Sequence, residues 1–291
     1  MISSADTRLA RLQREYPEWE PWLSLLQAVL RDSQDSRWQA YVPLRPPVES
    51  GKMPFLTGAT IFAEAQETLR WFDKLLRLAA PLTNAESAGL RRLDRSVLRE
   101  RILELLQASI CQSAPRFDDL AQALQVEAKT LRALADLAAV PFLHACRRRW
   151  SALIPEGLSQ GYCPICGAWP AFVEEQGIER TRRLRCGRCG TAWPAECLRC
   201  PYCDMAEHRQ LTSLVQTTGG EARRIDGCKR CRGYVKTFTV LQGSPPEAVL
   251  LDDLASVDLD IAALDAGYVR PANPGYDPGV HVSALHVKCE I

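Results

Sequence analysis

The sequence predicts an α+β protein in which an N-terminal all-α domain is followed by two small tandem β modules and a C-terminal acidic helical tail. Three observations carry this prediction. Apolar residues recur three and four positions apart in the first half, nine of the twelve cysteines lie between Cys163 and Cys231, and acidic side chains crowd the segment after residue 246. We expect the helical domain over 1–158, the β modules over 159–195 and 196–243, and the tail over 244–291.

Length and composition are those of a folded protein of about two domains. The chain has 291 residues, against roughly 100 to 200 for one domain. Its 46% hydrophobic and 24% charged residues exclude disordered, collagen-like and coiled-coil chains. With 36 basic and 35 acidic side chains the formal net charge is +1, so the whole molecule lacks a field that would attract nucleic acid or an anionic membrane.

The first half of the chain is predicted to be a series of helices. The clearest amphipathic pattern runs from Ile61 to Ala79 and ends at Pro81, which cannot continue a helix. A second helix is expected from Thr83 toward Cys111. Shorter helices are expected around 22–30, 118–124 and 128–139.

The N-terminus and the distribution of apolar residues favour the cytoplasm. The first ten residues are largely polar and charged, where a secretory signal needs about 7 to 15 apolar residues in a row. No stretch approaches the roughly 18 apolar residues of a membrane helix. We therefore expect a cytoplasmic protein without a membrane span. In that compartment thiols stay reduced, and clustered cysteines bind metal or do redox chemistry more often than they form disulfides.

Four Cys-x2-Cys pairs divide the cysteine-rich region. They are Cys163 with Cys166, Cys186 with Cys189, Cys200 with Cys203, and Cys228 with Cys231. Each pair places two sulfurs on one side of a tight turn, so two facing turns close a tetrahedron around one metal ion. Nineteen residues separate the first two pairs, and twenty-four, enough for a hairpin, separate the last two. We expect each neighbouring couple to share an ion, because local closure costs the least chain entropy.

Closed four-thiolate sites of this kind are mostly structural. A catalytic zinc site keeps an open position and usually includes histidine or a carboxylate, whereas His208 is the only histidine in this region. A small β module usually needs such a staple, because its short apolar runs cannot bury a sufficient core. The modules should therefore resemble zinc ribbons or rubredoxins, since four thiolates suit zinc and mononuclear iron alike.

Two further features of the cysteine-rich region have alternative interpretations. Cys197 forms an overlapping pair with Cys200, and it is either an auxiliary thiol, reactive or exchangeable as a ligand, or a spare buried cysteine beside a metal site. Four arginines form a local basic strip, which is either a solvated strand face or a docking patch for an acidic partner. The strip consists of Arg180, Arg182, Arg183 and Arg185.

The acidic tail is predicted to contain a docking helix. Residues 247–265 hold six acidic side chains and no basic ones, and their leucine, isoleucine and valine residues suggest an apolar face. After Gly267 a stretch rich in proline and glycine is expected to form a loop or loose tail.

The ordered series of motifs resembles the formate dehydrogenase accessory protein family (FdhE). The likeness covers roughly 160–275 and rests on the four cysteine pairs and on the segments between and after them. These segments include Pro170, Trp193, Asp226-Gly227, Gly233-Tyr234-Val235-Lys236, Asp252 to Asp260, Gly267-Tyr268 and Asn273-Pro274. The helical half agrees with the family in position and character only.

This resemblance implies a cytoplasmic assembly and maturation factor that is not an enzyme. Its partner would be the catalytic subunit of a respiratory formate dehydrogenase, with no nucleic acid involved and with an oligomeric state that the sequence leaves open. The resemblance also implies two iron ions of rubredoxin type, one on each set of four thiolates, with zinc as the alternative occupant. Cys197 lies outside the family's pattern of four pairs.

Two functions from other classes stay open as alternatives. An iron-based redox or electron-transfer protein would use the same sulfurs and would absorb visible light. A nucleic-acid-binding zinc-ribbon protein is the second, because 120–134 resembles a helix-turn-helix. Acidic residues outnumber basic ones around that segment, which argues against a helix that lies in the major groove of DNA.

Overall fold

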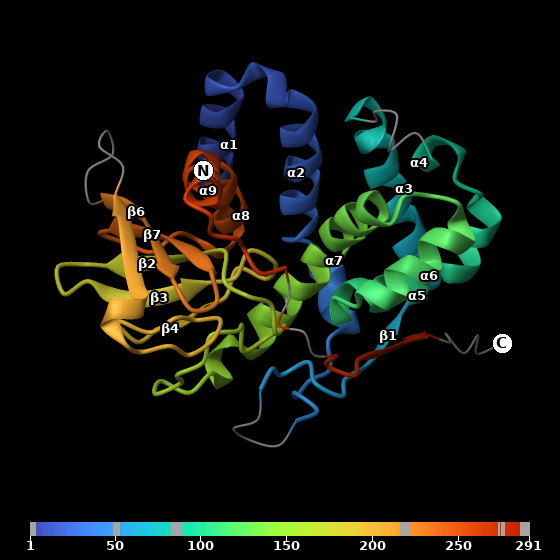
Figure 1. The fold of residues 1–291 in the computed structure, drawn as a ribbon. Coiled ribbons are helices and arrows are strands. Elements are labelled where there is room, and N and C mark those ends of the chain that lie inside the picture. The colour runs from blue at the N-terminus through green and yellow to red at the C-terminus, as the bar shows by residue number, and fades with distance from the viewer. Residues whose placement is uncertain are drawn as a thin grey trace. The chain divides into compact units, whose positions relative to one another are not determined.

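A computed structural model describes residues 4–48, 53–82, 89–215, 222–272, 274 and 277–285, which form two compact units (Figure 1). The helical unit comprises 9–149 and 277–291, and the ribbon unit comprises 1–8 and 150–276. The α+β class is confirmed, because helices dominate the first unit and a six-stranded sheet lies in the second. The four-part division of the chain stays a prediction.

Amphipathic helices build the helical unit. Within it α5 packs against α3 and α6, and α2 packs against α3. Phe72, Phe117 and Phe142 are among its fully buried side chains. None of the described helices combines the length and apolar character that crossing a membrane requires. The helices are α1 (Ser4–Glu15, which begins in the ribbon unit), α2 (Glu20–Asp32), α3 (Ala65–Ala79), α4 (Gly89–Arg92), α5 (Arg95–Cys111), α6 (Ala114–Leu124) and α7 (Ala128–Trp150).

The predicted helix from Ile61 is wrong at its start. Residues Thr60–Ala63 form strand β1, which pairs in parallel with β8 (His281–Ala284) near the end of the chain. The helix α3 begins only at Ala65, where the Glu64 carboxylate accepts hydrogen bonds from the backbone N–H groups of the first turn. Because the strand partner lies more than two hundred positions away, the local apolar spacing could not reveal it.

Two other helix boundaries differ from the expectation. The predicted start at Thr83 lies outside the described residues, and the segment after it is split into α4 and α5. Asp94 caps α5 by accepting a hydrogen bond of 2.8 Å from the Ser96 N–H. The last helix continues past Ala139 and through Pro141 to Trp150. Its residues around the proline are almost entirely buried, so tertiary packing outweighs the roughly 3 kcal/mol cost of an interior proline.

One continuous sheet joins the two β modules of the ribbon unit. Its strand order is β4-β3-β2-β7-β6-β5, with each module contributing three neighbouring strands. The seam is the parallel pair β2 and β7, in which Phe172 lies opposite Lys236, whereas all other pairs are antiparallel. The strands are β2 (Phe172–Gln176), β3 (Thr181–Arg185), β4 (Ala192–Pro194), β5 (Leu211–Val215), β6 (Arg223–Cys228) and β7 (Tyr234–Val240).

The acidic tail packs on one face of this sheet as two helices, not one. These are α8 (Val249–Leu254) and α9 (Val257–Asp265), and the Ser256 hydroxyl between them bonds to the Asp252 carbonyl at 2.9 Å. Leu259 of α9 is fully buried in a cluster with Ile225 and Tyr234 of the sheet. The expected docking of the tail is therefore present within the ribbon unit.

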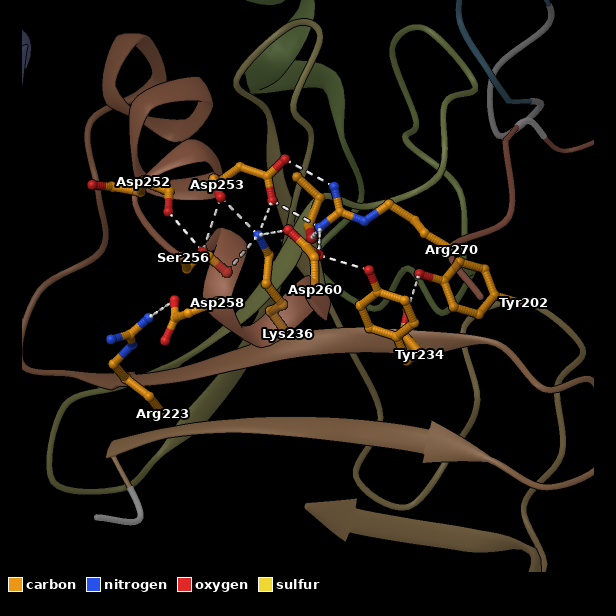
Figure 2. Close-up of polar contacts among 11 residues, drawn as sticks. Tyr202, Arg223, Tyr234, Lys236, Asp252, Asp253, Ser256, Asp258, Asp260 and Arg270 are labelled. Carbon is orange, nitrogen blue, oxygen red and sulfur yellow. Dashed lines mark hydrogen bonds and ion pairs between the residues drawn. The ribbon is translucent and has the colours of Figure 1, made fainter. Parts of the chain in front are cut away.

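A buried lysine fixes these helices to the seam (Figure 2). The Lys236 side chain is fully buried, and its Nζ lies 2.6 Å from Asp253 Oδ1 and 2.9 Å from Asp260 Oδ2. Arg270 pairs with the same two aspartates at 2.8 and 3.1 Å. Burial alone would raise the pKa of Asp253, but hydrogen bonds and charge from Arg270 and Lys236 outweigh it and lower that pKa. Two cations thus neutralise two partly buried carboxylates.

Replacing Lys236 should loosen the docking of α8 and α9. In Lys236→Met two partly buried carboxylates lose one of their cations, and we expect about 3 kcal/mol of lost stability. Urea unfolding of the metal-loaded chain, followed by far-UV circular dichroism, measures the loss. Lys129→Met is the control, because Lys129 is exposed, lies outside both cysteine centres, and its loss should change stability by less than about 0.5 kcal/mol. Equal midpoints for the two variants would show that the ion pairs contribute nothing net.

Candidate metal centres

Centre one, defined by Cys163, Cys166, Cys186 and Cys189, brings the first two cysteine pairs together. Its four sulfurs all lie within 4.8 Å of one another. Cys163 Sγ lies 3.4 Å from Cys189 Sγ, and Cys166 Sγ lies 3.5 Å from Cys186 Sγ. A tetrahedron with metal–sulfur bonds of about 2.3 Å has edges of about 3.8 Å, so the sulfurs are spaced for one ion.

Centre two, defined by Cys200, Cys203, Cys228 and Cys231, repeats the arrangement with the last two pairs. Cys200 Sγ lies 3.7 Å from Cys231 Sγ, and Cys203 Sγ lies 3.7 Å from Cys228 Sγ. Every described cysteine is free of disulfide bonds. The grouping is the sequence-local one, first pair with second and third with fourth. That these eight residues ligate metal stays a prediction, which the geometry fits.

The same backbone hydrogen bonds shape the turns. In the first pair the Cys163 N–H donates to the Ala168 carbonyl at 2.8 Å, and the Gly167 N–H donates to the Cys163 carbonyl at 2.8 Å. The second and third pairs repeat both bonds, and the fourth repeats the first of them, from the Cys228 N–H to the Gly233 carbonyl at 2.9 Å. One local conformation therefore presents two sulfurs at each pair.

This conformation needs a left-handed residue directly after the second cysteine. Gly167 and Gly190 fill that position with φ of 74° each. In centre two, however, Asp204 and Arg232 occupy it, with φ of 61° and 59°. Gly233, the glycine visible after the fourth pair, serves another purpose: a Cβ there would lie 2.7 Å from the Tyr202 ring.

The surroundings of the sulfurs favour a bound cation. Burial raises the pKa of the Cys163 and Cys200 thiols, so thiolates at these positions require a compensating positive charge. Donors already turn toward the sulfurs, because the Cys189 N–H lies 3.4 Å from Cys186 Sγ and the Gly233 N–H lies 3.4 Å from Cys231 Sγ. A soft dication with four thiolate ligands fits this donor set, and both zinc and iron qualify.

Tyr202 connects centre two to the sheet and to the first module. Its hydroxyl donates to the Tyr234 carbonyl at 2.8 Å, and its ring meets Trp169 edge-on at 5.2 Å between centroids. The neighbouring Pro201 lies so close to Gly161 that no side chain would fit there. Sequence reasoning missed these residues, although the order Cys-Pro-Tyr-Cys placed Tyr202 inside the third pair.

Cys197 belongs to neither cluster. The alternative of a spare buried cysteine is wrong, because Cys197 is exposed. An auxiliary role for this thiol stays a prediction.

The structure separates the arginine strip into two kinds of residue. Arg185 is almost fully buried, with Nη1 2.5 Å from Glu174 Oε2. Arg182 pairs with Asp226 at 3.1 Å and with Glu175 at 3.6 Å, on strands of both modules. Arg180 and Arg183 form no ion pair with a described residue. Of the four arginines, only Arg180 and Arg183 have side chains outside the ion pairs of the described residues. A role for these two in docking an acidic partner stays a prediction.

The number of metal ions bound per chain should show which cysteines are ligands and whether Cys197 is one of them. Cys200→Ser replaces a soft thiolate in centre two, and we expect the purified chain to lose one of two ions. Cys197→Ser, three positions away, should keep both. Metal analysis of protein purified without oxygen measures the difference. If Cys200→Ser keeps two ions, Cys200 is not a ligand.

The chain is similar in sequence to known proteins. The family profile described as "FdhE, C-terminal domain" matches residues 196–274, which include all of centre two with α8 and α9. The chain is 29% identical to Protein FdhE of Escherichia coli O127:H6 over 257 residues, covering 77% of this chain and 82% of that protein.

Relatives from Pseudomonas aeruginosa extend the likeness. A Protein FdhE homolog is 30% identical over 218 residues, covering 69% of this chain and 64% of that protein. The crystal structure of the FdhE protein from the same species shares the fold, with a TM-score of 0.54, 24% identity and 94% of each chain covered. The chain thus resembles FdhE proteins over most of its length, and the resemblance that its cysteine pairs indicated is confirmed.

Proposed function

We propose that this chain is a formate dehydrogenase accessory protein that binds the catalytic subunit of a respiratory formate dehydrogenase in the cytoplasm and supports its maturation. The observation that carries the proposal is the match of residues 196–274 to the FdhE C-terminal domain. That segment contains one complete metal centre and the two helices docked beside it. The metal-stapled ribbon unit would be the scaffold that holds the client.

A binding role agrees with the chemistry of the two centres. Four sulfurs fill every position of a tetrahedral ion, so neither centre leaves a position for a substrate or a reactive water. We propose two iron ions of rubredoxin type as the occupants, with zinc as the alternative. A bound ion would contribute by cross-linking two turns whose strands are too short to bury a core alone.

The outer side of α9 offers a surface for the client. Val257, Ile261 and Leu264 are 38%, 55% and 56% exposed and lie on the side of the helix opposite the buried Leu259. Their spacing of four and three residues forms one apolar stripe. An unassembled subunit exposes apolar interface that would otherwise aggregate, and a stripe of this kind can cover part of it. The acidic residues Asp258 and Asp265 border the stripe, so the contacting client segment should be apolar and basic.

Co-purification of the client tests this surface. We expect the double variant Ile261→Ser, Leu264→Ser to recover roughly tenfold less formate dehydrogenase catalytic subunit than the unchanged chain, because central apolar contacts carry much of the binding energy. The matched control is Ile178→Ser, which removes another exposed isoleucine, 97% accessible, in the turn between β2 and β3. Metal content and circular dichroism should be unchanged in both variants.

The outcomes of this experiment distinguish a wrong function from a wrong binding surface. Equal recovery by all three proteins would remove α9 from the interface. No recovery of the subunit even by the unchanged, metal-loaded chain would contradict the proposed function itself.

A further inference from the structure

The two metal centres share a cysteine pattern but differ in access. All four cysteines of centre one are at most 1% exposed. In centre two Cys200 and Cys228 are buried, whereas Cys203 and Cys231 are only half-buried. Centre one has a further layer, because the Thr191 hydroxyl lies 3.0 Å from Cys189 Sγ and Gly190 packs against the Pro246 backbone. Solvent and external donors can therefore reach the sulfurs of centre two alone.

A cavity leads to centre two. Its volume is about 270 Å³, and Cys200 and Cys228 form part of its lining. Leu198, Tyr202 and Leu211 supply apolar wall, and His208 lies at the same cavity. No cysteine of centre one borders it. Since one water occupies about 30 Å³ in the liquid, a donor group of several heavy atoms can approach these sulfurs.

Local charge favours a negatively charged donor. An ion of charge +2 bound by four thiolates leaves a net charge of about −2, which repels anions. The fourth pair, however, holds Lys229 and Arg230 between its cysteines, both exposed and neither in an ion pair with a described residue. In centre one the first pair has proline and isoleucine at the same two positions, and the second pair has a glycine and the half-buried Arg188. Centre two thus carries its own positive charge at the exposed turn.

We propose that centre two is an exchangeable metal site, which gives its ion to anionic thiolate or carboxylate donors through this cavity, whereas centre one is a permanent staple. The inference rests on the metal occupancy given under the proposed function. In the exchange step donor atoms of the incoming ligand replace the four cysteine sulfurs one after another. The ion leaves with its charge of +2, no electrons are transferred, and each freed thiolate takes a proton from water.

Chelation kinetics test the division between the centres. The chain is first loaded with two Zn²⁺ ions and then mixed with excess EDTA, an anionic chelator, while free thiols are alkylated and located by mass spectrometry. We expect one equivalent of zinc to leave at least tenfold faster than the other. Among the eight cysteines of the two centres, the first alkylated should be those of centre two, Cys200 and Cys228 at the cavity and the half-buried Cys203 and Cys231. Release of both ions at one rate, or early alkylation of the centre-one cysteines, would overturn the proposal.

Two variants test the route and the charge. Leu198→Trp places a larger side chain at the cavity and should slow the fast phase severalfold, with Ile178→Trp as the control that leaves it unchanged. Lys229→Gln with Arg230→Gln should slow release to EDTA but not to neutral phenanthroline. A fast phase that neither variant changes would remove the cavity and the charged turn from the mechanism. A chain that never loads an ion at centre two would overturn the inference together with the occupancy on which it rests.

Discussion

Closure of four sulfurs around each centre is the constraint on which the ribbon unit depends. The strands that flank the cysteine turns are three to seven residues long, too short to bury a stable core alone. Thiols packed at 3.4 to 3.8 Å also repel one another once ionised. A shared cation would resolve both problems, because it would replace the repulsion by metal–sulfur bonds and fix the two turns at one point. The regular hydrogen bonds of the four turns then follow from the need to aim every sulfur inward.

Between the centres, the seam of β2 and β7 makes one scaffold out of two modules. On one face of the sheet Lys236 joins the seam to the acidic helices, and on the other Arg182 of the first module pairs with Asp226 of the second. Both sets are networks in which every buried carboxylate meets more than one cation, the arrangement in which buried charges are tolerated. A rigid scaffold of this kind would lower the entropy cost of the client binding proposed above.

Sequence patterns predicted the parts of this structure that local spacing controls, and failed where distant segments meet. The cysteine pairs, their sequence-local grouping and most helices follow from spacings within about twenty-five residues. The apolar spacing at Ile61 predicts a helix, whereas pairing with a strand at residues 281–284 makes this segment a strand. The arginine strip looked like a single surface, although alternation along β3 sends Arg182 and Arg185 into separate ion-pair networks. Nothing in the spacing of Asp226 or Asp253 reveals these partners.

The two centres differ although they share one motif. The motif determines which residues surround the ion, whereas the residues around the motif determine how easily the site is reached. Both centres have four cysteines and similar turns, so the motif alone predicts the same role for both. Access is decided by residues outside the motif: Pro246 and Thr191 close centre one, whereas Tyr202 and Leu198 leave a cavity at centre two. Centre two also lies within the segment that matches the FdhE C-terminal domain, and the same segment includes the helix whose apolar stripe is exposed. A labile ion at that point would link metal loading to the state of the surface proposed for client binding, which a second buried four-cysteine site could not do.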